Sequence, residues 1–193
     1  MDYTKKIKIG DKIYTAKTDF KTALKCNEIA EDETIGDFER VLGILYTLFG
    51  EDGINIPEHY EKLLKWAKNY LSCGNEEPAK GEADMSWQQD MPLIEASFMY
   101  DYKIDLTKEN MSWEKFYSLV NGLSNSEFGN CCVLNRVRNL RNFDISTIKD
   151  AKERQKILEA KKMVALKKHK KQITEQQINS AKRFYEALGY RKE

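Results

Sequence analysis

The stretch from Ser86 to Leu123 constrains the fold most, because two helical repeats follow one another within it. The first repeat has apolar residues at about helical spacing: Met91, Ile94, Phe98 and Tyr102. The second has the i, i+3, i+4, i+7 pattern of a buried face: Trp113, Phe116, Tyr117 and Val120. Asp90 can cap the first helix, and Pro92 suits its first turn, where a missing N–H costs little. The pattern predicts a helical hairpin in a core.

The N-terminal residues predict a β-hairpin followed by a helix. Lys6–Ile9 and Lys12–Ala16 alternate polar and apolar side chains on either side of Gly10-Asp11, which is typical of a short turn between strands. A lone hairpin is marginal in water, so we expect it to lie on the helices. Asp19 is expected to cap a helix that runs to about Ala30.

Two further helices are predicted before residue 75. Thr34–Asp37 resembles a capping box, with Asp in place of Glu. The helix after it has a regular apolar series: Phe38, Val41, Leu42, Leu45 and Phe49. The next helix is expected to begin at Pro57 and to end near Gly74, which suits the residue after a helix.

The C-terminal half predicts three more helices. Ser124 is expected to cap a helix from about 126 to 138, followed by extended chain over 140–147. A long basic helix is predicted over 148–171. Between Lys149 and Gln172 there are ten Lys or Arg and three Asp or Glu, a net charge of +7. Thr174–Gln177 resembles a capping box for a last helix that closes at Gly189.

These segments together predict a mainly α fold. We expect a single domain over 1–193, with about seven helices, a short N-terminal β-hairpin and a long basic C-terminal helix. Its parts are the hairpin, the N-terminal helices, a polar linker loop, the central helical hairpin with the following helix, and the basic C-terminal helices: 1–17, 18–74, 75–85, 86–147 and 148–193.

Composition and motifs exclude several classes of function. The 193 residues include 32 basic and 31 acidic ones, so net charge gives no argument for nucleic-acid binding. The four cysteines and two histidines lack zinc-ligand spacing, and no catalytic motif is present. We therefore expect a protein that is not an enzyme and has no metal or cofactor. Without a signal peptide or a long apolar run, it is expected to be cytosolic.

At this point several motifs resemble one family. DMPLIEASFMYDYKIDL from Asp90, then WEKF, NGL and FDISTIKDAKERQKILEAKK, closely resemble the gene-product-fifteen family of tailed bacteriophages. YTAKTDF and KWAKNYLSCG fit the family as well, so the resemblance runs from about Tyr14 to about Leu166. The chain departs from the family at Lys103, where glycine is frequent, and at Trp113-Glu114, where two tryptophans are frequent.

The resemblance implies a tail assembly chaperone, which keeps the long helical tape-measure protein soluble in the cytoplasm of the host bacterium. The expected partners are that protein and other tail proteins, and homo-oligomerisation stays open. No membrane and no nucleic acid of defined sequence is expected as a partner. The alternatives are a structural tail or connector component of the virion and a nucleic-acid-binding protein that uses the Lys-rich helix.

The basic and apolar residues near the C-terminus are the predicted partner-binding site. An amphipathic last helix could receive client helices, and the lysines before it could steer acidic client segments. The residues are Lys167, Lys168, Lys170, Lys171, Ile178, Ala181, Phe184, Tyr185 and Leu188. The alternative for this helix is simple packing on the domain.

Overall fold

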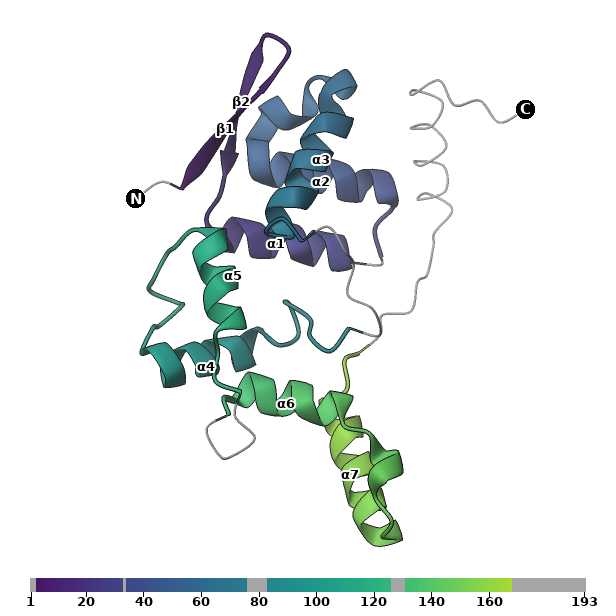
Figure 1. The fold of residues 1–193 in the computed structure, drawn as a ribbon. Coiled ribbons are helices and arrows are strands. Elements are labelled where there is room, and N and C mark those ends of the chain that lie inside the picture. The colour runs from purple at the N-terminus through teal and green to yellow at the C-terminus, as the bar shows by residue number, and fades with distance from the viewer. Residues whose placement is uncertain (1–2, 33, 76–82, 126–130, 168–193) are drawn as a thin grey trace, which may run out of the picture. The chain divides into compact units, whose positions relative to one another are not determined.

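The structure, a computed structural model, describes residues 3–32, 34–75, 83–125 and 131–167. These residues form seven α-helices and one two-stranded antiparallel sheet (Figure 1), which confirms the prediction of a mainly α fold with an N-terminal hairpin. Contacts divide the chain into two compact units. Among the described residues, the first holds 3–75 and 111–114, and the second holds 83–110 and 115–167. The single-domain organisation stays a prediction.

The predicted β-hairpin is confirmed in the first unit. Strand β1 (Thr4–Ile9) pairs with β2 (Lys12–Lys17), and Ile9 lies opposite Lys12. Gly10 has a φ of 60° in the two-residue turn, a conformation that glycine adopts without the steric cost of a Cβ. One face of the hairpin is buried, through Ile9, Tyr14 and Ala16.

Three helices complete the first unit: α1 (Phe20–Glu31), α2 (Asp37–Phe49) and α3 (Tyr60–Leu71). Short 3₁₀ helices, Gly50–Ile54 and Pro57–His59, join the last two. As predicted, Asp19 caps α1, accepting from Thr22 N at 3.0 Å. The predicted capping box before α2 is wrong in register. Gly36 is the cap, and its N–H donates to Glu39 Oε2 at 2.7 Å.

Residues 111–114 belong to the first unit. Phe20 N donates to Met111 O, and Trp113 N donates to Thr18 O, each at 3.0 Å. The Trp113 indole is fully buried and donates through Nε1 to Leu71 O at 3.0 Å. Backbone and side-chain bonds therefore fix this segment, and a buried Trp N–H has the partner it requires.

Four helices are assigned wholly or in part to the second unit: α4 (Met91–Tyr102), α5 (Trp113–Asn121, counted here from Lys115), α6 (Val133–Asn142) and α7 (Ala151–Val164). A 3₁₀ helix, Ile145–Thr147, precedes α7. The core is aromatic and aliphatic: Ile94, Phe98, Phe116, Val120 and Leu134 are buried.

The predicted helix over 126–138 is displaced in the structure. The helix found in this region, α6, begins at Val133. Cys132 caps it, because its Sγ accepts a hydrogen bond from Asn135 N at 3.4 Å. Ser124 is not the cap, because its N–H and hydroxyl both donate to the Asp101 carboxylate, at 2.7 and 2.9 Å. The predicted extended chain over 140–147 is wrong in part, because α6 continues to Asn142 and a 3₁₀ helix follows.

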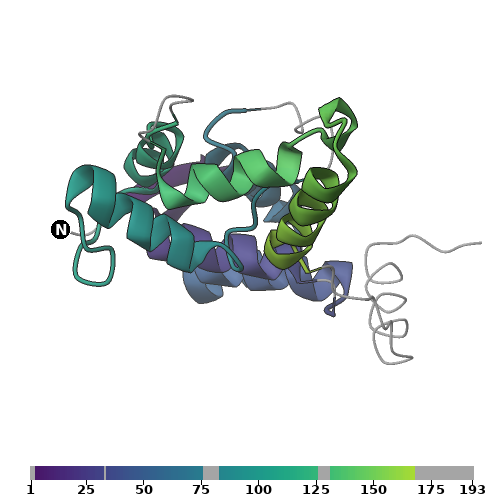
Figure 2. The same cartoon turned by 90° about the horizontal axis from the view of Figure 1, so that it is seen from below.

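Helix α7 is shorter than the predicted helix over 148–171. It begins at Ala151, after the Asp150 cap, and ends at Val164. Ala165 is extended, with a ψ of 139°. The connector 143–150 runs back beside α7 (Figure 1 and Figure 2), where Lys161 Nζ donates to Phe143 O at 2.5 Å. At Ala165 the tertiary structure therefore overrides the helical pattern of the sequence.

Lys103 gives a first testable prediction. It follows α4 in a left-handed conformation, with a φ of 57°, which costs a residue with a Cβ about 1–2 kcal/mol. Lys103→Gly is expected to raise the free energy of unfolding by about 0.5–1 kcal/mol in urea denaturation. Lys103 Nζ also donates to Tyr100 O at 2.8 Å. Lys103→Ala is therefore the control, which loses that bond and keeps the Cβ. If the glycine variant is less stable than the alanine variant, the left-handed backbone at position 103 does not strain a residue with a Cβ.

Candidate functional site

The predicted partner-binding residues fall almost entirely outside the described residues. Lys167 is described and exposed. The others, Lys168, Lys170, Lys171, Ile178, Ala181, Phe184, Tyr185 and Leu188, lie outside the described part of the chain. Their role therefore stays a prediction.

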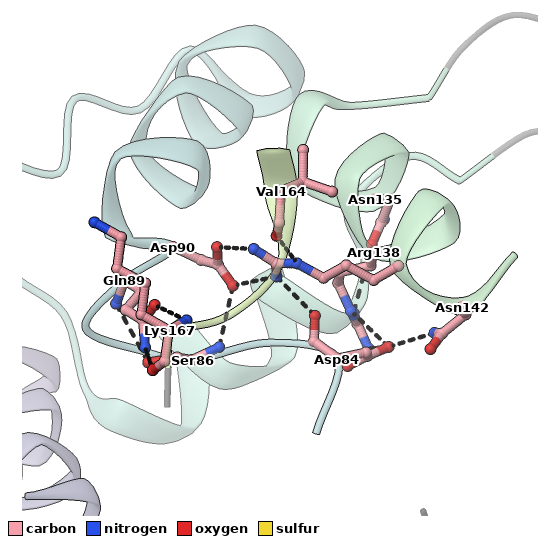
Figure 3. A network of polar contacts seen from close by, with 10 residues as sticks. Asp84, Ser86, Gln89, Asp90, Asn135, Arg138, Asn142, Val164 and Lys167 are labelled. Carbon is pink, nitrogen blue, oxygen red and sulfur yellow. Dashed lines mark hydrogen bonds and ion pairs between the residues drawn. The ribbon is translucent and has the colours of Figure 1, made fainter. Parts of the chain in front are cut away.

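A buried ion pair joins the start of α4 to the end of α6. Arg141 Nη1 donates to Asp90 Oδ2 at 2.7 Å, and Nη2 donates to Oδ1 at 2.8 Å. The side chains are 12% and 2% exposed, respectively. Ser86 N also donates to Asp90 Oδ2, at 3.1 Å (Figure 3). Two parallel bonds of this kind fix both the distance and the orientation of the two groups.

The same arginine binds two backbone carbonyls. Arg141 Nε donates to Val164 O at 2.6 Å, at the end of α7, and Nη1 donates to Asp84 O at 2.8 Å. The Asp84 carboxylate in turn accepts from Arg138 Nε at 3.2 Å and from Asn142 Nδ2 at 2.9 Å (Figure 3). Helix α6 thus presents three side chains to the segment that leads into α4.

Lys167 joins this network through its backbone. Its N–H donates to Gln89 Oε1 at 2.8 Å, and its C=O accepts from Gln89 Nε2 at 3.0 Å (Figure 3). A side-chain amide that pairs with both polar groups of one residue holds that residue as a strand neighbour would. Lys167 is therefore fixed beside the start of α4.

This network is called here the clamp, and it consists of Asp84, Ser86, Gln89, Asp90, Arg138, Arg141, Asn142, Val164 and Lys167. The Asp90 carboxylate accepts three hydrogen bonds and is paired with a guanidinium, so both of its oxygens are engaged in structural contacts. Sequence reasoning named Asp90 as the cap of α4, but its side chain makes no cap hydrogen bond. The sequence carried no signal for its partner, because the two residues are 51 positions apart.

The cysteines offer no reactive group in the first unit. Cys26 is buried and Cys73 is half-buried. Burial raises the pKa of the Cys26 thiol to about 12 and that of Cys73 to about 11. Because the thiolate is the nucleophile, both are weakly reactive near neutral pH. Within the described residues, no three His, Cys, Asp or Glu side chains lie together as a metal site would require.

The Cys26 pKa predicts an alkaline loss of stability. Burial raises the pKa of the Cys26 thiol from 9.0 to about 12 in the folded chain, so the unfolded state binds fewer protons between these values. The free energy of unfolding is therefore expected to fall as the pH rises from about 9 to 12. In Cys26→Ala the part of this fall that the thiol causes should disappear, as measured by urea midpoints between pH 9 and about 12. If the free energy of unfolding falls equally steeply with pH in the variant and the wild type, the prediction is wrong.

Helix α4 carries an apolar surface opposite its buried side. Ile94, Ser97 and Phe98 face the core. The opposite side, called here the α4 face, consists of Pro92, Leu93, Ala96, Met99 and Tyr100. Leu93 is half-buried and the others are exposed, Met99 by 45% and Tyr100 by 61%. Helices that are apolar all round are usually buried, and contiguous exposed apolar patches mark interaction sites. The α4 face is therefore a candidate docking surface.

The comparisons with known proteins identify a family. A family model described as Bacteriophage Gp15 protein matches residues 2–166. The chain belongs to the bacteriophage Gp15 family. It is thus a bacteriophage protein of the structural or assembly kind, and the match includes both the clamp, apart from Lys167, and the α4 face. No curated protein and no solved structure matches the chain.

Within the described ranges, each helix is too short or too polar to cross a bilayer.

Proposed function

We propose that this Gp15 protein is a tail assembly chaperone that holds the tape-measure protein of its phage soluble in the host cytoplasm. The observation that carries the proposal is the α4 face. Its exposed residues recur at i, i+4, i+7 and i+8, the spacing with which one helix receives an amphipathic helix of another chain. A tape-measure protein is a long helical chain that exposes apolar stripes until its tail partners cover them.

The chemistry of the α4 face suits reversible holding. Met99 is flexible and fits varied apolar surfaces, and Ala96 leaves room for a close helix. Lys103 Nζ lies 5.6 Å from the centre of the Tyr100 ring, so charge borders the face. An apolar surface interrupted by charge binds without becoming a permanent core. The basic residues from Lys167 onward, the predicted site, would add electrostatic steering that weakens at high salt.

Co-expression tests the proposal. The tape-measure protein should be insoluble alone, soluble with the full chain, and less soluble with a chain that ends at Lys171. Ala96→Glu should also reduce its solubility, because the carboxylate would be placed in the docking contact. Ile13→Glu, at a site 58% exposed on the hairpin, is the matched control. If the full chain neither co-purifies with the client nor changes its solubility, the chaperone role fails.

A structural component of the virion is the second candidate. It is favoured by the same family membership, which includes structural as well as assembly roles. Mass spectrometry of purified particles beside infected-cell lysate separates the two. A chaperone should be abundant in lysate and missing from particles, whereas a tail or connector component should be present in both.

Nucleic-acid binding has less support. Helix α7 has five Lys or Arg and two Glu, so its net charge is +3. Its sequence has no aromatic residue on which a base could stack. Arg154 and Lys161 are engaged with backbone carbonyls of the connector. A solvated basic helix accounts for these features without a nucleic-acid partner.

A further inference from the structure

The outer edge of strand β1 is unpaired within the described residues. The sheet there consists of β1 and β2, and β2 is the strand that packs on α2 (Figure 1). Thr18 N donates to Tyr3 O at 2.8 Å, in the register of the β1–β2 ladder. Because bonded and non-bonded pairs alternate along an antiparallel ladder, the N–H and C=O groups of Thr4, Lys6 and Lys8 point away from β2. This row of backbone donors and acceptors is called here the β1 edge.

The side chains along the β1 edge belong to a basic face of the hairpin. Residues 4, 6 and 8 of β1 share this face with residues 13, 15 and 17 of β2, opposite the buried face. It has three lysines and no acidic residue: Lys6, Lys8 and Lys17. All three are exposed, and none has an ion pair among the described residues. By contrast, the lysines of the other face are paired. Lys5 contacts Glu114, and Lys12 lies 2.9 Å from Asp52.

This charge pattern decides which kind of occupant fits the β1 edge. A second copy of the chain, paired edge to edge, would place lysines opposite lysines, which is destabilising. Lysines on an edge strand are a common protection against such self-pairing. A nucleic acid would find no aromatic side chain on this face for base stacking, and it would leave the backbone groups of the strand unused. An acidic strand satisfies both the charges and the backbone groups.

We propose that the β1 edge binds an extended acidic segment of another protein by strand addition. Acidic residues at every second position of that segment lie opposite Lys6 and Lys8, where cross-strand Cβ atoms are about 5 Å apart. The intervening residues lie on the other face, beside the half-buried Ile7, and are apolar. Backbone hydrogen bonds give the affinity, and the alternating side chains give the selectivity. The contact belongs to the first unit and does not require the chaperone role.

Amide hydrogen exchange, followed by NMR, tests the contact in the full ¹⁵N-labelled chain. The probe is an acetylated eight-residue peptide of alternating Glu and Val. With about nine-tenths of the chain bound, exchange at Lys6 and Lys8 should slow by about tenfold, because it then proceeds through the unbound fraction. Exchange at Ile13 and Thr15, whose N–H groups point outward from β2, should not change. The same peptide with Lys in place of Glu should give no protection.

A charge-reversed pair of variants tests the role of the lysines. Lys6→Glu/Lys8→Glu should raise the dissociation constant of the Glu-Val peptide by about tenfold or more in an NMR titration, since two attractions become repulsions. Lys62→Glu/Lys65→Glu is the matched control. It makes the same change in net charge at two exposed lysines of α3 and should alter the dissociation constant by less than about twofold.

A backbone variant separates strand addition from attraction by charge alone. Thr4→Pro keeps Lys6 and Lys8 and removes one outward N–H, and proline is accepted at the first residue of an edge strand. Loss of one hydrogen bond should raise the dissociation constant by about threefold to tenfold. An unchanged dissociation constant would contradict strand addition.

Other results would also overturn the proposal. Protection of Lys6 and Lys8 that rises with protein concentration in the absence of peptide would assign the β1 edge to a second copy of the chain. Peptide binding without slower exchange at these two residues would mean attraction by surface charge only. Tighter binding of an oligothymidylate than of the Glu-Val peptide would assign the face to nucleic acid. No binding of the peptide, or equal binding of its lysine counterpart, would exclude an acidic partner.

Discussion

Arg141→Met is expected to lower the free energy of unfolding of the second unit by about 3–5 kcal/mol. The Asp90 carboxylate is 2% exposed, and the substitution would leave it with Ser86 N as its remaining hydrogen-bond donor in the clamp. A buried charge without a counter-ion costs more than the pair contributed, because its desolvation is no longer compensated. Val164 O and Asp84 O would lose a donor in the same step.

Hydrogen exchange, resolved by peptide, measures this effect within the second unit. Protection should fall over α6 and over 164–167, the part of the chain that Arg141 and Gln89 hold. Arg138→Met is the matched control. Its partner Asp84 is 27% exposed, so the loss should stay near about 1 kcal/mol. The double variant Asp90→Leu/Arg141→Met should recover part of the stability, because it leaves no buried charge. Equal losses for the two arginine variants would contradict the clamp.

The elements that the sequence predicted well are those whose signals are local. Asp19 lies next to the helix that it caps, and the Gly10-Asp11 turn lies between two alternating strands. Helix periodicity over α2 and α3 needs no knowledge of distant residues, so these helices were predicted to within a few positions. Local propensity and the tertiary structure agree in these segments.

The segment 124–150 was predicted poorly because distant partners decide its structure. Ser124 has the chemistry of a helix cap, but the Asp101 carboxylate, 23 positions earlier, takes both of its donors. A cysteine caps α6 instead, and cysteine is not among the usual cap residues. The end of α7 follows the same rule, because Arg141 binds its last carbonyl. Sequence periodicity does not contain these contacts.

The sequence pointed to the segment that holds the candidate site only through its resemblance to a family. The DMPLIEASF motif was the most specific part of the resemblance, and it holds both Asp90, the centre of the clamp, and most of the α4 face. Periodicity placed Met91, Ile94, Phe98 and Tyr102 on one side of this helix and left Met99 off that side. In the structure Ile94 and Phe98 are buried, whereas Met99 is 45% exposed.

That separation gives the second large prediction. Phe98→Ala is expected to lower the free energy of unfolding of the second unit by about 3–5 kcal/mol. Phe98 is fully buried, its ring stacks on Phe116 with centroids 5.3 Å apart, and it meets the edge of Tyr102 at 5.5 Å. Alanine would leave a cavity between two rigid rings, which cannot close without moving α4 or α5.

Met99→Ala is the control, since it truncates the adjacent side chain on the exposed side of the same helix. We expect the free energy of unfolding to change by less than about 0.5 kcal/mol. Urea denaturation followed by hydrogen exchange over α4 and α5 measures both variants. The two should also separate by function. A folded Met99→Ala chain should hold less tape-measure protein in solution, because it removes part of the α4 face and none of the core. Equal stability losses for Phe98→Ala and Met99→Ala would mean that both sides of α4 are buried, and the α4 face would no longer be available to a client.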